Sequence, residues 1–137
     1  MNFPRAFLQI YALACLFTAV VLTHDAEAGS RVGVNQEQAI KIANQEVIKL
    51  GLDLQDLDME IDKGNARWDE YMSILRESGV AESREQYKEY QAKLKGKTHW
   101  TILYFPKRIE GRRPKGGGAI VLVDAREGQV LIVVRGE

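Results

Sequence analysis

The apolar residues that follow Asn35 recur at the spacing of one helix face. They are Ala39, Ile40, Ala43, Val47 and Leu50. Asn35 and Gln38 have the residue types and the spacing of a capping box, in which each side chain binds the backbone N–H of the other residue. Gly51 is a residue type that readily ends a helix in the left-handed conformation. The pattern predicts an amphipathic helix over residues 36–50.

Residues 57–62 alternate apolar and acidic side chains, which is the period-two pattern of a half-buried strand. Lys63, Gly64 and Asn65 supply a turn after it. The acidic residues bear some likeness to a calcium loop, but an EF-hand needs Gly at its sixth position, where the chain has Ile61 or Lys63. We interpret the acidic side as a solvated strand face that also discourages edge-to-edge pairing.

Residues 66–95 carry the pattern of two helices. The apolar positions of the first are Trp68, Met72 and Leu75, and those of the second are Tyr87, Tyr90 and Leu94. Ser78 and Gly79 are expected to break the stretch in two. Ser83 and Gln86 have capping-box spacing and predict the start of the second helix. Because that helix is mostly charged, we expect it on the surface.

Three further strands are predicted by apolar, largely β-branched runs. The runs span residues 100–105, 119–123 and 130–134. Pro106 ends the first run, since proline cannot donate to a strand ladder. The connection over residues 124–129 predicts a tight hairpin, in which Asp124 binds the turn backbone and Gly128 adopts a positive φ.

The predicted fold class is α+β. An N-terminal helix packs on a four-stranded antiparallel sheet, and residues 66–95 form a helical insert between strands 1 and 2. Because the last three strands are apolar throughout, the sheet is expected to be covered on both faces, or by helices on one face and by a partner on the other. Residues 29–137 then form a single domain, since the length leaves room for one.

Residues 1–28 are predicted to be a secretory signal peptide. A basic start at Arg5 precedes an apolar stretch over residues 6–22, and the small residues that end at Ala28 provide a cleavage site. The alternative is that the segment is kept as a membrane anchor, for which an apolar stretch of about 17 residues is barely long enough. We expect a periplasmic or secreted bacterial protein whose only association with a membrane is through this segment.

The composition argues against several function classes. The chain has 19 basic and 19 acidic residues and is 45% hydrophobic, which excludes a disordered tail and a strongly basic nucleic-acid protein. Beyond the signal segment it has no Cys and a single His, His99, so neither a nucleophilic Cys–His or Ser–His site nor a zinc site is expected. We therefore expect no enzyme activity, no catalytic residue, no metal and no cofactor.

Basic residues concentrate just before the glycine run at 116–118. They are Lys107, Arg108, Arg112, Arg113 and Lys115. Such a loop can bind phosphates, lipid headgroups or an acidic partner, or it can be a solvated hairpin tip. No aromatic residue lies in it to stack a base, so no nucleic-acid partner is expected. The candidate binding residues are Trp100, Tyr104, Arg112, Arg113 and Lys115, with the core as the alternative place for both aromatic residues.

Two stretches together resemble PepSY-like domains. Residues 35–43 resemble their capped opening helix. From Val123 to Leu131 the chain reads Val-Asp-Ala-x-x-Gly-x-Val-Leu, which resembles their closing hairpin. The resemblance implies a protein of the bacterial cell envelope that binds or inhibits a peptidase and has no catalytic residues. The helical insert departs from the family pattern.

A second resemblance is to small NTF2-like immunity proteins, which neutralise toxins. It rests on Trp100 near a strand start, followed by Gly-Gly and a strand–Asp–Gly–strand hairpin. The expected function is therefore that of an exported, non-catalytic domain that binds a protein or peptide of the cell envelope, with a peptidase as the first candidate. The alternatives are an immunity-type protein, or a binder of a small ligand or envelope lipid with the sheet as a cup and the basic loop as a lid.

Overall fold

The computed structural model describes residues 33–136. Within this range the main elements are α1 (Gln36–Lys49), β1 (Leu57–Ile61), α2 (Ala66–Glu77), α3 (Ala81–Leu94), β2 (His99–Pro106), β3 (Ala119–Asp124) and β4 (Val130–Arg135). Short 3-10 turns, η1 (Leu54–Asp56) and η2 (Lys63–Asn65), flank β1. The predicted signal peptide, residues 1–28, lies outside the described residues. None of the helices in the described range is both long and apolar enough to span a membrane.

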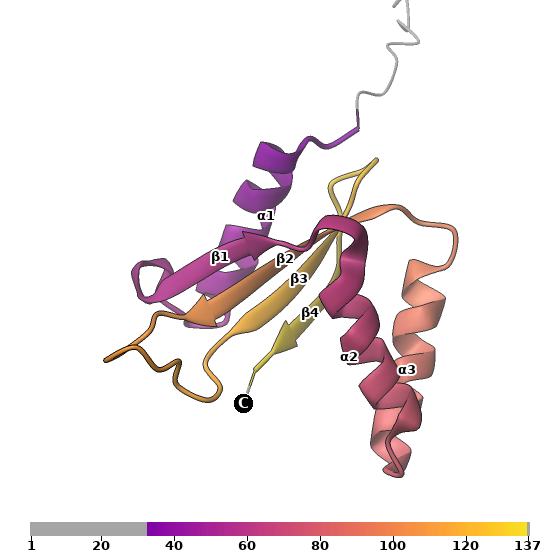
Figure 1. The fold of residues 1–137 in the computed structure, drawn as a ribbon. Coiled ribbons are helices and arrows are strands. Elements are labelled where there is room, and N and C mark those ends of the chain that lie inside the picture. The colour runs from indigo at the N-terminus through magenta and orange to yellow at the C-terminus, as the bar shows by residue number, and fades with distance from the viewer. Residues whose placement is uncertain (1–32, 137) are drawn as a thin grey trace, which may run out of the picture.

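The four strands form one antiparallel sheet in the order β1–β2–β3–β4 (Figure 1). Each strand pairs with the next one along the chain, so β1 and β4 are the two edges. The helical insert, α2 and α3, connects β1 to β2. This arrangement confirms the predicted α+β fold.

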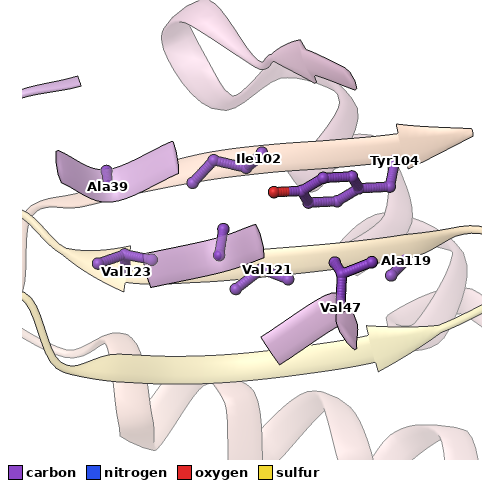
Figure 2. Close-up of a cluster of buried hydrophobic side chains, with 8 residues drawn as sticks. Ala39, Val47, Ile102, Tyr104, Ala119, Val121 and Val123 are labelled. Atoms are coloured by element: carbon purple, nitrogen blue, oxygen red, sulfur yellow. The ribbon is translucent and has the colours of Figure 1, made fainter. Parts of the chain in front are cut away.

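α1 covers one face of the sheet. The predicted capping box is present: Asn35 Oδ1 accepts from the Gln38 N–H at 2.9 Å, and Gln38 Oε1 accepts from the Asn35 N–H at 3.0 Å. The apolar stripe of the helix packs on β2 and β3 (Figure 2). This cluster consists of Ala39, Ala43, Val47, Ile102, Tyr104, Ala119, Val121 and Val123. Two alanines in the stripe allow the helix backbone to lie close to the strands.

α2 and α3 pack against the opposite face. Their cluster consists of Trp68, Leu75, Tyr90, Leu122 and Ile132. Val121 and Leu122 are successive residues of β3, so their side chains point to opposite faces and the two clusters lie on opposite sides of the sheet. The Trp68 backbone N–H donates to the Asp62 carboxylate at 2.9 Å, which joins the start of α2 to the end of β1. Helices therefore lie on both faces of the sheet, as expected, although α2 and α3 cover only part of theirs.

One predicted helix start is wrong. Ser83 does not cap α3, which begins at Ala81 with Val80 at its N-cap and no side-chain capping bond. Instead the Ser78 hydroxyl accepts from the Val80 N–H at 3.1 Å. This local bond turns the chain within residues 78–80, so the helix resumes before Ser83 is reached. The predicted surface position of α3 holds for most of its residues, although Tyr90 is buried.

Candidate binding groove

Trp100 and Tyr104 both point toward α1. The Trp100 indole N–H donates to the Val34 carbonyl at 2.8 Å, and the Tyr104 hydroxyl donates to Asn44 Oδ1 at 2.7 Å. Tyr104 is only 2% exposed, and this burial raises the pKa of its hydroxyl above the usual value. These are the contacts of core residues. The Tyr104 side chain is thus buried in the core, as the core alternative predicts, although the residue also borders the groove described below.

The three basic candidates in the connection between β2 and β3 point in different directions. The backbone groups of Ile109 and Arg112 bind each other at 2.8 and 3.0 Å and close a turn, which leaves Arg112 exposed at the tip. Lys115 lies at a shallow cleft beside the start of β1. Arg113 alone reaches the sheet face opposite α1. The loop residues thus do not form one basic patch over the sheet.

An open groove of about 780 Å³ lies on that second face of the sheet. Its floor is made by Leu103, Phe105, Ile120 and Val134 from β2, β3 and β4. One wall comes from α2 and α3, through Arg67, Glu70, Tyr71, Gln86 and Tyr90. The other wall comes from Arg113, Pro114, Gly116 and Gly118 of the connection between β2 and β3. The insert packs on the cross-strand pair of Leu122 and Ile132. Ile120 and Val134 form the next pair on the same face of the sheet, two residues along each strand. The insert therefore packs on the part of this face around Leu122 and Ile132 and forms a wall beside the open part, where Ile120 and Val134 are only partly buried.

Charged side chains gather around Phe105 at the β1 side of the groove. The guanidinium carbons of Arg67 and Arg113 lie 5.3 and 4.6 Å from the centre of the Phe105 ring. Arg67 also faces Glu60 at 3.6 Å, and Arg113 faces Asp58 at 3.7 Å. Both carboxylates belong to the acidic side of residues 57–62, and both are exposed as predicted. Asp62, the third acidic residue of that side, was predicted wrongly: it is buried, because its carboxylate accepts from the Trp68 N–H. The groove thus has an apolar floor and a rim that contains two arginines from separate parts of the chain.

A second cleft, of about 790 Å³, lies between α2 and α3, with His99 among its lining residues. Neither ring nitrogen of His99 has a hydrogen-bond partner among the described residues, and the Lys97 backbone approaches the ring without hydrogen-bond geometry. Burial lowers the pKa of His99 and outweighs the opposing effects of Lys97 and of the Asp69 and Asp124 carboxylates. In the part of the chain that the structure describes, no three His, Cys, Asp or Glu side chains are placed to hold a metal ion.

The hairpin between β3 and β4 has the predicted geometry. Asp124 Oδ1 accepts from the backbone N–H groups of Arg126 at 2.8 Å and Glu127 at 3.1 Å, and Lys97 Nζ lies 3.2 Å from Oδ2. Gly128 has a φ of 70°. The Arg126 N–H first, and then the Glu127 N–H and Lys97, hold the pKa of the Asp124 carboxyl below its usual value. The turn covers this carboxylate locally, although it lies near the periphery of the molecule.

The lowered pKa of Asp124 predicts a stability contribution that is lost in acid. It is fully present above the unfolded pKa of about 3.9 and is lost as the pH falls through the lower folded pKa. Asp124→Asn keeps an acceptor oxygen but removes the charge, so we expect a loss of about 1–2 kcal/mol at pH 7. Urea unfolding at several pH values between 7 and 3 should show a shallower pH dependence for the variant. An unchanged pH dependence would contradict the role of this carboxylate.

Comparisons with family models, curated proteins and solved structures found no match to this chain. The resemblances to PepSY-like domains and to NTF2-like immunity proteins therefore remain predictions that rest on the short motifs described above.

The groove is formed largely by residues that sequence reasoning did not select. They are Arg67, Tyr71, Tyr90, Leu103, Phe105, Ile120 and Val134, whereas Arg113 was a predicted binding residue. One signal was available in β2, because period-two alternation places Leu103 and Phe105 on the face opposite Tyr104. No sequence signal showed that the insert would leave half of that face open.

Proposed function

We propose that this protein is an exported, non-catalytic binding domain whose groove holds an extended segment of a partner protein. The observation that carries the proposal is the open, apolar half of a sheet face, walled by α2, α3 and the connection between β2 and β3. On the same face α2 and α3 pack around Leu122 and Ile132, and β1 presents the exposed carboxylates of Asp58 and Glu60. An apolar floor with aromatic residues and arginines at its rim has the composition of a protein-binding surface.

The β4 edge supports an extended ligand in particular. β4 is an edge strand with five consecutive apolar residues, and Val133, Val134 and Arg135 line the groove. The other edge, β1, presents Asp58 and Glu60, which discourage pairing with another strand. An extended segment can enter the groove over this apolar edge and cross the floor toward Phe105 on β2, whereas a segment paired with β4 itself would lie about 14 Å from β2.

A peptidase is the first class of partner to test, because the resemblance to PepSY-like domains implies one. Inhibition of a thermolysin-type metallopeptidase by the purified protein would support this class of partner. Neutralisation of a protein toxin would support the immunity-type alternative. Binding of a small molecule or lipid in the groove, without binding of any peptide, would favour the ligand binder instead.

The groove predicts the outcome of a peptide-library selection. The purified protein should select peptides, and Ile120→Glu should weaken their binding at least tenfold, because it places a charge in the apolar floor. Ile48→Glu is the matched control, since Ile48 is 58% exposed on α1, away from the groove. Fluorescence anisotropy with labelled peptides measures both affinities. Selection of no peptide, or equal effects of the two substitutions, would contradict the proposal.

A further inference from the structure

We propose that Arg67 and Arg113 form a clamp for a carboxylate on the bound segment, so that the groove selects an acidic residue next to apolar ones. The inference rests on the proposed function, since it specifies the chemistry of the segment that the groove takes. The occupant is an extended segment of a second protein with an Asp or Glu side chain at the position of Phe105. Apolar side chains beside that residue would lie over Ile120 and Val134.

The geometry of the two arginines suits this ligand. Arg67 lies at the start of α2 and Arg113 lies in the connection between β2 and β3, yet their guanidinium carbons lie 5.3 and 4.6 Å, respectively, from the centre of the Phe105 ring. Contact with the Phe105 ring restrains the orientation of each guanidinium. Each guanidinium still carries N–H donors that a carboxylate bound beside the ring can engage.

The donors of both arginines are only weakly engaged in the free protein. The N–O distances to Glu60 and Asp58 are 3.6 and 3.7 Å, longer than a hydrogen bond, and the four side chains are between 38% and 52% exposed. Exposed ion pairs of this kind contribute little to stability. A ligand carboxylate can therefore replace either internal partner at small cost. Asp58 and Glu60 act as internal competitors for the clamp.

The charge of the groove favours an acidic ligand. Its lining includes Arg67, Arg113 and Arg135 and one carboxylate, Glu70. In the free protein Asp58 and Glu60 stand beside two of these arginines, so the lining gains its positive charge when a ligand carboxylate displaces them. An acidic segment is complementary to this lining, whereas a basic segment would be repelled. The apolar floor excludes a ligand that is acidic throughout, because some of its charges would be buried without partners.

The first test compares two peptides that differ by one charge. A peptide selected by the unmodified protein is synthesised with its Asp or Glu and with Asn or Gln in its place. We expect the acidic form to bind about tenfold more tightly, and we expect Arg67→Gln with Arg113→Gln to abolish that difference. Arg84→Gln with Arg126→Gln is the matched control, since it removes the same charge from exposed sites outside the groove. The lysine double variant, R67K with R113K, should restore part of the preference.

The second test removes the internal competitors. Asp58→Asn with Glu60→Gln should tighten binding of the acidic peptide several-fold and leave the neutral peptide unchanged. Glu37→Gln with Glu127→Gln changes the net charge equally at exposed sites away from the clamp and should have little effect. An equal gain in both double variants would overturn the competition between the β1 carboxylates and the ligand.

The outcomes separate the clamp from the proposed function. If the protein selects peptides without acidic residues, or if the arginine variant keeps the preference, the clamp is overturned and the binding groove stands. If no peptide is selected, both fail. If the arginine variant loses binding only to anionic phosphatidylglycerol vesicles, the clamp serves lipid headgroups and the peptide assignment is overturned.

Discussion

Trp68→Ala is expected to reduce the free energy of unfolding by about 3–5 kcal/mol, which is a large part of the stability of a domain of this size. Trp68 lies on α2 and is 2% exposed, and it packs against Leu122 and Ile132 of the sheet and against Tyr90 of α3, whose ring centre is 5.7 Å away. Its removal leaves a cavity over Leu122 and Ile132, which the helices cannot close without moving. Urea unfolding of the two proteins measures the loss.

Ile74→Ala is the matched control for this prediction. Ile74 lies on the same helix but is 62% exposed, so its truncation should cost less than about 0.5 kcal/mol. Amide hydrogen exchange then shows which part of the structure is affected. In the Trp68 variant, α2 and α3 should lose protection before β2 and β3. A loss below about 1 kcal/mol would mean that the insert does not depend on this contact.

The helices and strands with regular apolar spacing could be predicted from the sequence, because each of their positions lies either on the core side or on the solvent side of its element. The capping box at Asn35 and the turn at Asp124 depend on bonds between neighbours in the chain, and both are present. The start of α3 was predicted wrongly at Ser83. The Ser78 hydroxyl binds the Val80 N–H and turns the chain earlier, so the helix already begins at Ala81. When two such residues lie within a few positions of each other, the local sequence alone does not show which of them will precede the helix.

The groove could not be predicted, because it depends on contacts between distant residues. β2 is apolar on both faces, so its sequence shows that both are covered but not by what. Tyr104 reaches α1, whereas Phe105 reaches arginines that lie 38 residues before it and 8 residues after it. An aromatic residue is a poor guide to an interface when the neighbouring position carries another one on the opposite face.

In the glycine run at 116–118, neighbouring glycines are required for different reasons: one for its backbone conformation and one for its close approach to another strand. Gly117 has a φ of 72°, and a side chain there would meet only the Pro106 ring, at 3.5 Å. Gly118 lacks a positive φ, but a Cβ atom there would lie 2.4 Å from the Tyr104 carbonyl oxygen. Gly118 also accepts from the Gly136 N–H at 2.9 Å, so it is held between β2 and the end of β4. The run is thus a close crossing of three chain segments and not a flexible spacer.

Gly118→Ala is therefore expected to cost about 3 kcal/mol, because the atoms that it would overlap are backbone and cannot rotate away. Gly117→Ala should cost about 1 kcal/mol, the penalty for a left-handed conformation with open space around it. Thermal and urea unfolding of both variants measure the difference. Because Gly118 lies in the groove wall, its variant should also weaken peptide binding, whereas the Gly117 variant should not. Equal losses of stability at the two positions would show that the run requires only conformational freedom, and the close approach of Gly118 to β2 would then have no energetic importance.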